Sequence, residues 1–212
     1  MIVSLIGMSG SGKTYWSCRL ADFGFQRISC DDRIENELRS QLSLDGCSGI
    51  KGVARWMGQP YEPGYREREA AYLAAETKVV QEILETLVRG MTRDLVIDTT
   101  GSVVHTGEEL CRGLPAQSTV VYLENSPTDF ELMFEQYLKD PKPVVWADLF
   151  RPQENETNGA ALARCYKELL QYRKALYEKY ARVTISASLI RQRQPDAKGF
   201  LDFVQRQLLT RC

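Results

Sequence analysis

Residues 7–14 read Gly7-Met8-Ser9-Gly10-Ser11-Gly12-Lys13-Thr14 and complete the pattern G-x-x-x-x-G-K-[ST]. The short apolar run Ile2-Val3-Ser4-Leu5-Ile6 precedes this pattern and predicts a buried strand, and the residues after it can continue as a helix. A strand, a glycine turn and a helix N-terminus together bind anions, because the loop N–H groups and the helix dipole both favour negative charge. The sequence therefore predicts a nucleotide-binding loop.

Two side chains of this loop carry its chemistry. Lys13 is expected to reach the β- and γ-phosphates of the nucleotide, and the Thr14 hydroxyl is expected to bind Mg²⁺. Gly7, Gly10 and Gly12 permit backbone angles that a Cβ atom would oppose. We therefore predict that the loop binds ATP together with Mg²⁺.

Length and composition are those of one globular α/β domain. The 212 residues have a mass of 24.1 kDa, with 43% hydrophobic and 26% charged residues, and a core of this size needs no disulfides. The six cysteines show no C-x-x-C spacing, and the single histidine, His105, is expected to be structural, so the sequence does not predict a zinc site. We expect reduced thiols in a cytoplasmic compartment.

Charge and hydropathy argue against several classes of partner. The net charge is −1 and the pI is about 6.0, so no basic excess indicates a nucleic-acid surface. No apolar run approaches the ~20 residues of a membrane span. The first predicted strand begins at Ile2, which leaves no room for a signal peptide. We expect a small-molecule substrate, no nucleic acid, no membrane, and a monomer.

Segments typical of strands and of helices alternate along the chain. Apolar runs predict strands near residues 2–6, 25–29, 94–98, 119–123 and 181–186. Helices are predicted at about 13–22, 31–40, 65–89, 127–138, 159–180 and 196–209. Gly90 is typical of a helix end, and Ser126-Pro127 of a helix start. The alternation predicts a single domain over 1–212, with a parallel sheet covered by helices on both faces.

Two stretches interrupt this alternation. Residues 43–64 contain five glycines and two prolines, and residues 139–158 contain three prolines and several amide side chains. Long loops in compact domains are often binding loops or lids. We predict a substrate-binding subdomain in the first stretch and a lid over the phosphates in the second; the alternative for each is a plain surface insertion.

Three aspartates follow predicted strands, where ligands of open α/β sheets bind. Asp31 and Asp32 come after residues 25–29. An aspartate there can orient or deprotonate an acceptor hydroxyl, or hold Mg²⁺ through water; alternatively, one of the pair caps the next helix. Asp98 ends the run Leu95-Val96-Ile97, and a carboxylate in that place faces the metal beside a phosphate-binding loop. The alternative for Asp98 is a structural cap.

Several cations lie in segments that can reach the predicted site. Arginine forks bind carboxylates and phosphates bidentately, so Arg66 and Arg173 are candidates for holding an anionic substrate. Composition alone favours solvated pairs for both. In the second long stretch, Lys139, Lys142 or Arg151 can neutralise charge that develops on a transferred phosphoryl group, or can simply be solvated.

In this order, the segments resemble the shikimate kinase family of small-molecule kinases along nearly the whole chain. After the phosphate-binding loop, the matching segments are Ser29-Cys30-Asp31-Asp32-Arg33-Ile34-Glu35 for D-x-D-x-x-I-E, Tyr65-Arg66-Glu67-Arg68-Glu69 for F-R-x-x-E, Asp98-Thr99-Thr100-Gly101-Ser102 in place of G-G-G, Lys142-Pro143-Val144-Val145 for the lid R-P-L-L, Arg173-Lys174-Ala175-Leu176-Tyr177 for R-x-P-L-Y, and Arg193-Gln194-Pro195 for the adenine loop.

The resemblance implies a three-layer P-loop NTPase fold, with a five-stranded parallel sheet in the order 2-3-1-4-5, a lid and a substrate-binding subdomain. It implies ATP and Mg²⁺ as cofactors. The roles it implies are Asp31 for the accepting hydroxyl, Arg66 and Arg173 for a substrate carboxylate, Gly101 for the substrate, Arg193 and Pro195 for adenine, and Lys142 for catalysis from the lid. Asp32 and Asp98, with Thr14, are the candidate metal ligands.

The chain departs from the family mainly at the acceptor pocket. Ser29 replaces the first aspartate of D-x-D, and Asp98 is a candidate replacement for that carboxylate. Thr100 and Ser102 stand where the family has glycine, and Lys142 lacks the fork of an arginine. No arginine occurs in 127–138, where the family stacks one on adenine.

These departures lead to three functional hypotheses. The first is ATP-dependent phosphorylation of a small hydroxylated carboxylate, with shikimate as the first candidate. The second is a kinase of a different polyol acid, nucleoside or nucleotide. The third is a nucleotide-binding regulatory module without efficient transfer.

Overall fold

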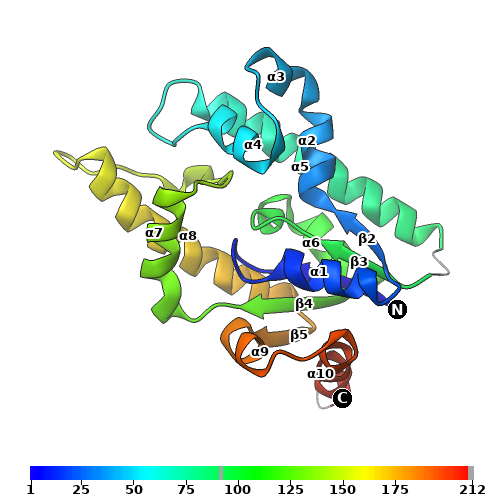
Figure 1. Ribbon diagram of the computed structural model, residues 1–212. Coiled ribbons are helices and arrows are strands. Elements are labelled where there is room, and N and C mark those ends of the chain that lie inside the picture. Colours follow the sequence, from blue (N-terminus) through cyan, green and yellow to red (C-terminus); the bar gives the residue numbers. More distant parts are fainter. Residues whose placement is uncertain (91–92, 210–212) are drawn as a thin grey trace.

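The computed structural model describes residues 1–90 and 93–209 and contains a sheet of five parallel strands (Figure 1). Their order is β2-β3-β1-β4-β5, which confirms the predicted fold class and topology. The strands are β1 (Ile2–Ile6), β2 (Gln26–Ser29), β3 (Leu95–Asp98), β4 (Thr119–Glu124) and β5 (Val183–Ser186). The carboxyl ends of β1, β2 and β3 therefore meet at one edge, where the phosphate-binding loop begins.

Side chains of the central strands alternate between two separate cores. Val3 and Leu5 of β1 belong to one hydrophobic cluster, and Ile6 belongs to the other. In β4, Val121 packs on the first side and Tyr122 on the second. Both faces of the sheet are thus buried, as expected for parallel strands that carry few charges.

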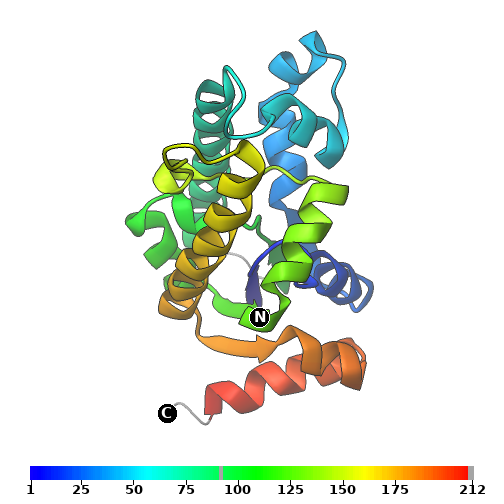
Figure 2. The ribbon, with the colours of Figure 1, turned by 90° about the vertical axis from the view of Figure 1, so that its left-hand side faces the viewer.

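Helices α1 (Lys13–Asp22) and α10 (Ala197–Leu209) cover the first face. Figure 2 shows α10 lying beneath β5 at the bottom of the molecule. Trp16 of α1 stacks on Phe200 of α10, with ring centroids 4.4 Å apart, so the first and last helices of the chain share one core.

The second face is covered by α5 (Tyr65–Val88), α6 (Glu108–Gln117) and α8 (Asn158–Tyr180). Helix α5 ends as predicted, with Gly90 in the left-handed region at φ 92°. Helix α6 was not predicted, because Gly113 and Pro115 make its sequence a poor match to a helix.

The stretch 43–64 is more regular than predicted. Helix α4 (Gly49–Met57) lies within it, and α2 (Cys30–Glu37) and α3 (Arg39–Leu44) lead into it. These three helices project above the sheet in Figure 1. Helix α4 buries Val53, Trp56 and Met57 on one side, which is the amphipathic spacing that stabilises a short helix despite its glycines. Gly58, at φ 75°, ends it.

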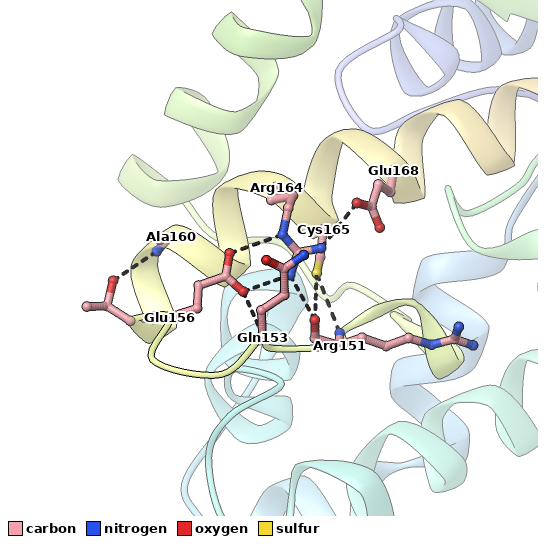
Figure 3. A network of polar contacts seen from close by, with 8 residues as sticks. Arg151, Gln153, Glu156, Ala160, Arg164, Cys165 and Glu168 are labelled. Atoms are coloured by element: carbon pink, nitrogen blue, oxygen red, sulfur yellow. Dashed lines mark hydrogen bonds and ion pairs between the residues drawn. The ribbon is translucent and has the colours of Figure 1, made fainter.

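The stretch 139–158 lies between α7 (Phe130–Lys139) and α8. The helix start predicted at Ser126-Pro127 is confirmed: Ser126 caps a 3₁₀ turn, Pro127–Asp129, that leads into α7. Arg164 fixes the end of the stretch, since it bonds to Glu156, Glu168 and the Arg151 carbonyl (Figure 3). Gln153 N–H also donates to Glu156, at 2.9 Å.

A second helix missed by the sequence reasoning is α9 (Ala187–Arg193), whose seven residues are too few to show a clear period. None of the helices in the described ranges is long and apolar enough to cross a membrane. The five cysteines of residues 1–90 and 93–209 are all free in the structure.

The stacked pair that joins α1 and α10 gives a test of the first core. We expect Phe200→Ala to lower the free energy of unfolding by about 3–5 kcal/mol, because Phe200 is fully buried and its loss leaves a cavity. Urea denaturation would measure this change. Phe23→Ala is the matched control, since Phe23 is 54% exposed; equal losses in both variants would contradict the packing argument.

Candidate functional site

The phosphate-binding loop folds back over Lys13. The Lys13 Nζ atom donates to the carbonyl oxygens of Gly7, at 2.7 Å, and Met8, at 2.9 Å. Burial lowers the pKa of Lys13 to about 8, and the nearby carboxylates of Asp98 and Asp31 oppose that fall. Lys13 therefore stays mainly charged at neutral pH and is oriented inside the loop.

Gly7 is the position in the loop that tolerates no side chain. Its φ is +143°, and a Cβ atom there would lie 2.7 Å from the Leu123 carbonyl oxygen. The first turn of the loop thus passes directly over the end of β4.

A cleft of about 430 Å³ opens beside the loop, a volume typical of small-molecule sites. Eleven of the residues proposed from sequence line it: Met8, Ser9, Gly10, Gly12, Lys13, Thr14, Asp31, Asp32, Gly101, Lys142 and Arg173. The sequence reasoning did not single out Ile50, Tyr72 and Tyr166, which also line it and supply apolar surface from α4, α5 and α8.

Asp31 lies in the first turn of α2, just after β2, and lines the cleft together with Lys13. Burial is the main cause that raises its pKa to about 6; the charge of Lys13 opposes the rise, and Asp98 adds to it. The alternative that Asp31 or Asp32 caps the next helix is wrong, because Ser29 is the N-cap and accepts from Asp32 N–H at 3.2 Å. Both carboxylates are thus left free for the cleft.

Asp98 lies directly beside Ser29, because β2 and β3 pair in that register. Its Oδ2 atom accepts from Arg27, at 2.7 Å, and from Ser17, at 2.9 Å. Its Oδ1 atom is buried and has no hydrogen-bond partner among the described residues. Asp98 itself is 3% exposed and does not line the cleft, whereas Arg27 does.

The wall that contains Thr100 and Ser102 is backed by an acid that the sequence reasoning missed. Glu76 of α5 is fully buried, and the Thr100 hydroxyl donates to its Oε1 atom. Burial raises the pKa of Glu76 to about 7, against the effects of hydrogen bonds from Thr100 and Ser102. A signal was present in the sequence: Glu76 interrupts the apolar stripe of Tyr72, Val79 and Ile83, which are buried on the same helix.

Arg173 lines the cleft but is already bound on two sides. Its Nε atom donates to His105 Nε2, at 3.1 Å, and its Nη2 atom donates to the Val145 carbonyl, at 2.7 Å. Burial and the charge of Arg173 lower the pKa of His105 to about 3, so the imidazole is neutral and can accept. In this structure His105 accepts a hydrogen bond from Arg173, and the expectation that it is structural stays a prediction.

Arg66 does not have the position that the resemblance implies. It is exposed and is not among the residues that line the cleft in the described part of the chain. Tyr65 and Glu69 of the same motif point inward instead: the Tyr65 hydroxyl donates to the Val144 carbonyl, and Glu69 accepts from the Ala147 N–H at 2.8 Å. The phase of α5 directs Arg66 outward once Tyr65 is buried.

Lys142 lines the cleft from the second long stretch. Its Nζ atom lies 2.8 Å from Asp140 Oδ2, and this pair holds the pKa of Asp140 near 2. Lys142 also lines a smaller cavity of about 280 Å³ that is bordered by Ser9 and Gly10, so this residue lies beside both cavities. Neither Lys139 nor Arg151 lines the main cleft in the described ranges.

The other side of the loop has a further cavity of about 620 Å³. It is lined by Ser11 and Gly12 of the loop, by Tyr15, Trp16 and Arg19 of α1, and by Ile190, Arg191 and Gln194. The two residues expected to bind adenine, Arg193 and Pro195, are not among the lining residues described here. Arg193 lies over the ring of Phe203 instead, while Arg191 donates to the Gly10 carbonyl at 2.8 Å.

The fold has counterparts among solved structures. The shikimate kinase of Acinetobacter baumannii, in complex with shikimate, aligns over 99% of this chain and 93% of its own, with a TM-score of 0.62 and 21% identity. The shikimate kinases of Aquifex aeolicus and Bacteroides thetaiotaomicron align over 97% and 100% of this chain and 96% and 99% of theirs, with TM-scores of 0.57 and 0.58 and 18% identity. No family model and no curated protein matches the sequence. The chain therefore has a shikimate-kinase-like fold.

Glu76→Gln should change how stability depends on pH. Since the folded-state pKa of Glu76 is raised from 4.5 to about 7, the folded protein binds this proton more tightly, and the wild type loses stability as the pH rises between those values. Glutamine does not titrate, so the variant should gain about 3 kcal/mol relative to wild type over this window.

Urea denaturation at pH 4.5 and pH 8 would measure this gain. Glu82→Gln is the matched control, because Glu82 is exposed on the same helix. An identical stability difference between the Glu76 variant and wild type at both pH values would show that Glu76 titrates like a solvated acid.

Proposed function

We propose that the protein is an ATP-dependent kinase that transfers the γ-phosphoryl group to a hydroxyl of a small acceptor. The single observation that carries this proposal is that one cleft contains both the phosphate-binding loop, with Lys13, and a free carboxylate, Asp31. Phosphoryl transfer requires little more of a protein than in-line positioning and charge stabilisation, and these groups provide both.

Each residue has a distinct task in the transfer. The loop N–H groups and Lys13 bind the phosphates. Asp31 orients the acceptor hydroxyl and accepts its proton; its pKa of about 6 leaves it ionised at neutral pH. Lys142, which adjoins Ser9 and Gly10, neutralises charge on the transferring group. The cavity beside Arg191 and Gln194 is the candidate site for adenine.

Mg²⁺ is the metal that this chemistry uses, and it neutralises phosphate charge when it is bound. The described residues contain no group of three or more His, Cys, Asp or Glu side chains that could hold a metal by themselves. That agrees with Mg²⁺ taking most of its ligands from phosphates and water. Thr14, at the cleft, and the unpaired Oδ1 atom of Asp98 are the proposed protein partners, with Asp32 as a further carboxylate at the cleft.

A small carboxylate-bearing acceptor, with shikimate first, is the proposed substrate. Arg173 supports a single anion site on the acceptor side of the cleft. The exposure of Arg66 removes the second arginine, so another polyol acid, or a nucleoside, belongs in the same screen.

The first test is a coupled assay of ADP release from ATP and Mg²⁺, with and without shikimate. We expect shikimate-dependent turnover, and we expect Lys13→Ala to lower it by at least ~10²–10³-fold, because a buried cation at the transferring phosphates is lost. Lys78→Ala is the control, since Lys78 is exposed on α5 and lines neither the main cleft nor the two cavities beside the loop. Turnover near wild type in Lys13→Ala would defeat the mechanism. ATP binding without stimulation by any acceptor would favour the regulatory module.

A second test concerns Asp98. We expect Asp98→Asn to raise the Mg²⁺ concentration for half-maximal activity by ~10-fold or more, because a charged metal partner becomes neutral. Arg27→Met removes the partner of Asp98 and keeps the carboxylate, so it should leave this concentration within about twofold. If both variants lose stability and neither changes the Mg²⁺ requirement, Asp98 serves only the ion pair.

A further inference from the structure

One wall of the cleft consists of hydroxyl groups backed by a buried acid. We propose that the cluster of Glu76, Thr100 and Ser102 binds a second hydroxyl of the acceptor, distinct from the one that is phosphorylated, and so selects acceptors that carry two or more hydroxyls. This inference rests on the function proposed above and assigns a specificity determinant to it.

The hydrogen bonds of Thr100 fix the direction in which its hydroxyl proton points. Its hydroxyl donates to Glu76 Oε1 and accepts from the Ser102 N–H at 3.1 Å, and the two hydroxyl oxygens lie 3.2 Å apart. A hydroxyl has one proton and two lone pairs, so the proton of Thr100 is committed to the acid behind the wall. Ser102 is therefore the donor in the contact between the two hydroxyls, and Thr100 uses both of its lone pairs to accept from Ser102. What the wall offers toward the cleft is the lone pairs of Ser102, whose proton Thr100 directs away from the cleft.

Glu76 maintains this polarity because its carboxylate can accept more hydrogen bonds than it receives. It is fully buried behind the wall, and its Oε2 atom has no hydrogen-bond partner in residues 1–90 and 93–209. When Glu76 is ionised it only accepts, so it draws hydroxyl protons away from the cleft. If a ligand competes for the contact between Thr100 and Ser102, the Ser102 proton can turn toward the acid as well.

A wall with this polarity binds a donor and rejects an anion. A ligand hydroxyl can donate to Ser102, whereas a ligand carboxylate would face the Ser102 lone pairs and the charge of Glu76 at low dielectric. Arg173 lies next to Gly101, and a Cβ atom built on Gly101 would be 3.5 Å from Arg173 Nη1. The cleft thus separates a place for a hydroxyl from a place for an anion.

The test measures binding, so that it does not depend on turnover. Calorimetry with the full chain and ADP would compare shikimate with analogues that each lack one ring hydroxyl, and adenosine with 2′-deoxyadenosine. We expect at least one compound with the full set of hydroxyls to bind wild type about tenfold more tightly than its deoxy partner. Thr100→Val should abolish that difference, Thr100→Ser should retain it, and ADP affinity should stay unchanged in both.

Glu76→Gln is the second variant, because its amide can donate toward Thr100 and reverse the polarity of the wall. Where an acceptor is phosphorylated, we expect a KM for that acceptor raised about tenfold, with kcat and the KM for ATP changed little. The inference is overturned if no compound binds more tightly than its deoxy partner, or if Thr100→Val keeps the difference. A different outcome would overturn the proposed function alone: no acceptor stimulates ADP formation, although the difference in binding between a compound and its deoxy partner persists.

Discussion

The burial of several ionisable side chains at one edge of the sheet is the constraint on which the site depends. Lys13, Asp98, Glu76 and Arg173 are all less than 10% exposed, and Asp31 lies among them. Each charge alone would be costly to remove from water, so the group is stable only because opposite charges and hydrogen bonds compensate one another. The pKa of Lys13 is lowered and the pKa values of Asp31 and Glu76 are raised, so each shift favours the uncharged form. The compensation of the buried charges is therefore partial.

Partial compensation has a functional consequence. In a fully paired network every polar atom has a partner, whereas here Asp98 Oδ1 and Glu76 Oε2 have no hydrogen-bond partner within the part of the chain that the structure describes. Groups with shifted pKa values and spare hydrogen-bonding capacity are typical of sites that bind ligands. The Arg27–Asp98 pair and the Arg173–His105 pair hold the remaining charges in fixed directions.

The sequence predicted the parts of the fold that depend on local pattern. The five strands, their order and the loop at residues 7–14 follow from apolar runs, glycines and the resemblance, and the structure agrees on strands and order. Helices α6 and α9 were missed because one contains glycine and proline and the other is one of the shortest. Helix α4, within the stretch 43–64 that was predicted as a substrate-binding subdomain, was not predicted because its glycines obscure its buried face.

The site was less predictable because it depends on which way a helix faces. At the start of α5, Tyr65 is buried, which turns Arg66 outward and brings Glu69 to the backbone at Ala147. The motif alone does not show which of its side chains face the cleft. The partners of Arg173, His105 and Val145, are 68 and 28 residues away and meet only in the folded chain.

The same contacts limit how an acceptor can lie. Arg173 of α8 donates to the Val145 carbonyl, and Glu69 of α5 accepts from the Ala147 N–H. These two hydrogen bonds attach the middle of the 139–158 stretch to α8 and α5. Lys142 of the same stretch lies nearer the phosphate-binding loop. Under the proposed function, Lys13 and Lys142 face the phosphates and Arg27 is paired with Asp98, so Arg173 is the cation that stabilises an anionic group of the acceptor, while Asp31 and Glu76 repel such a group. The hydroxyl to be phosphorylated must then approach Asp31 and the γ-phosphate, and the opposite face of the acceptor is left against Thr100 and Ser102. Charge placement, more than cleft shape, therefore determines the orientation of the acceptor.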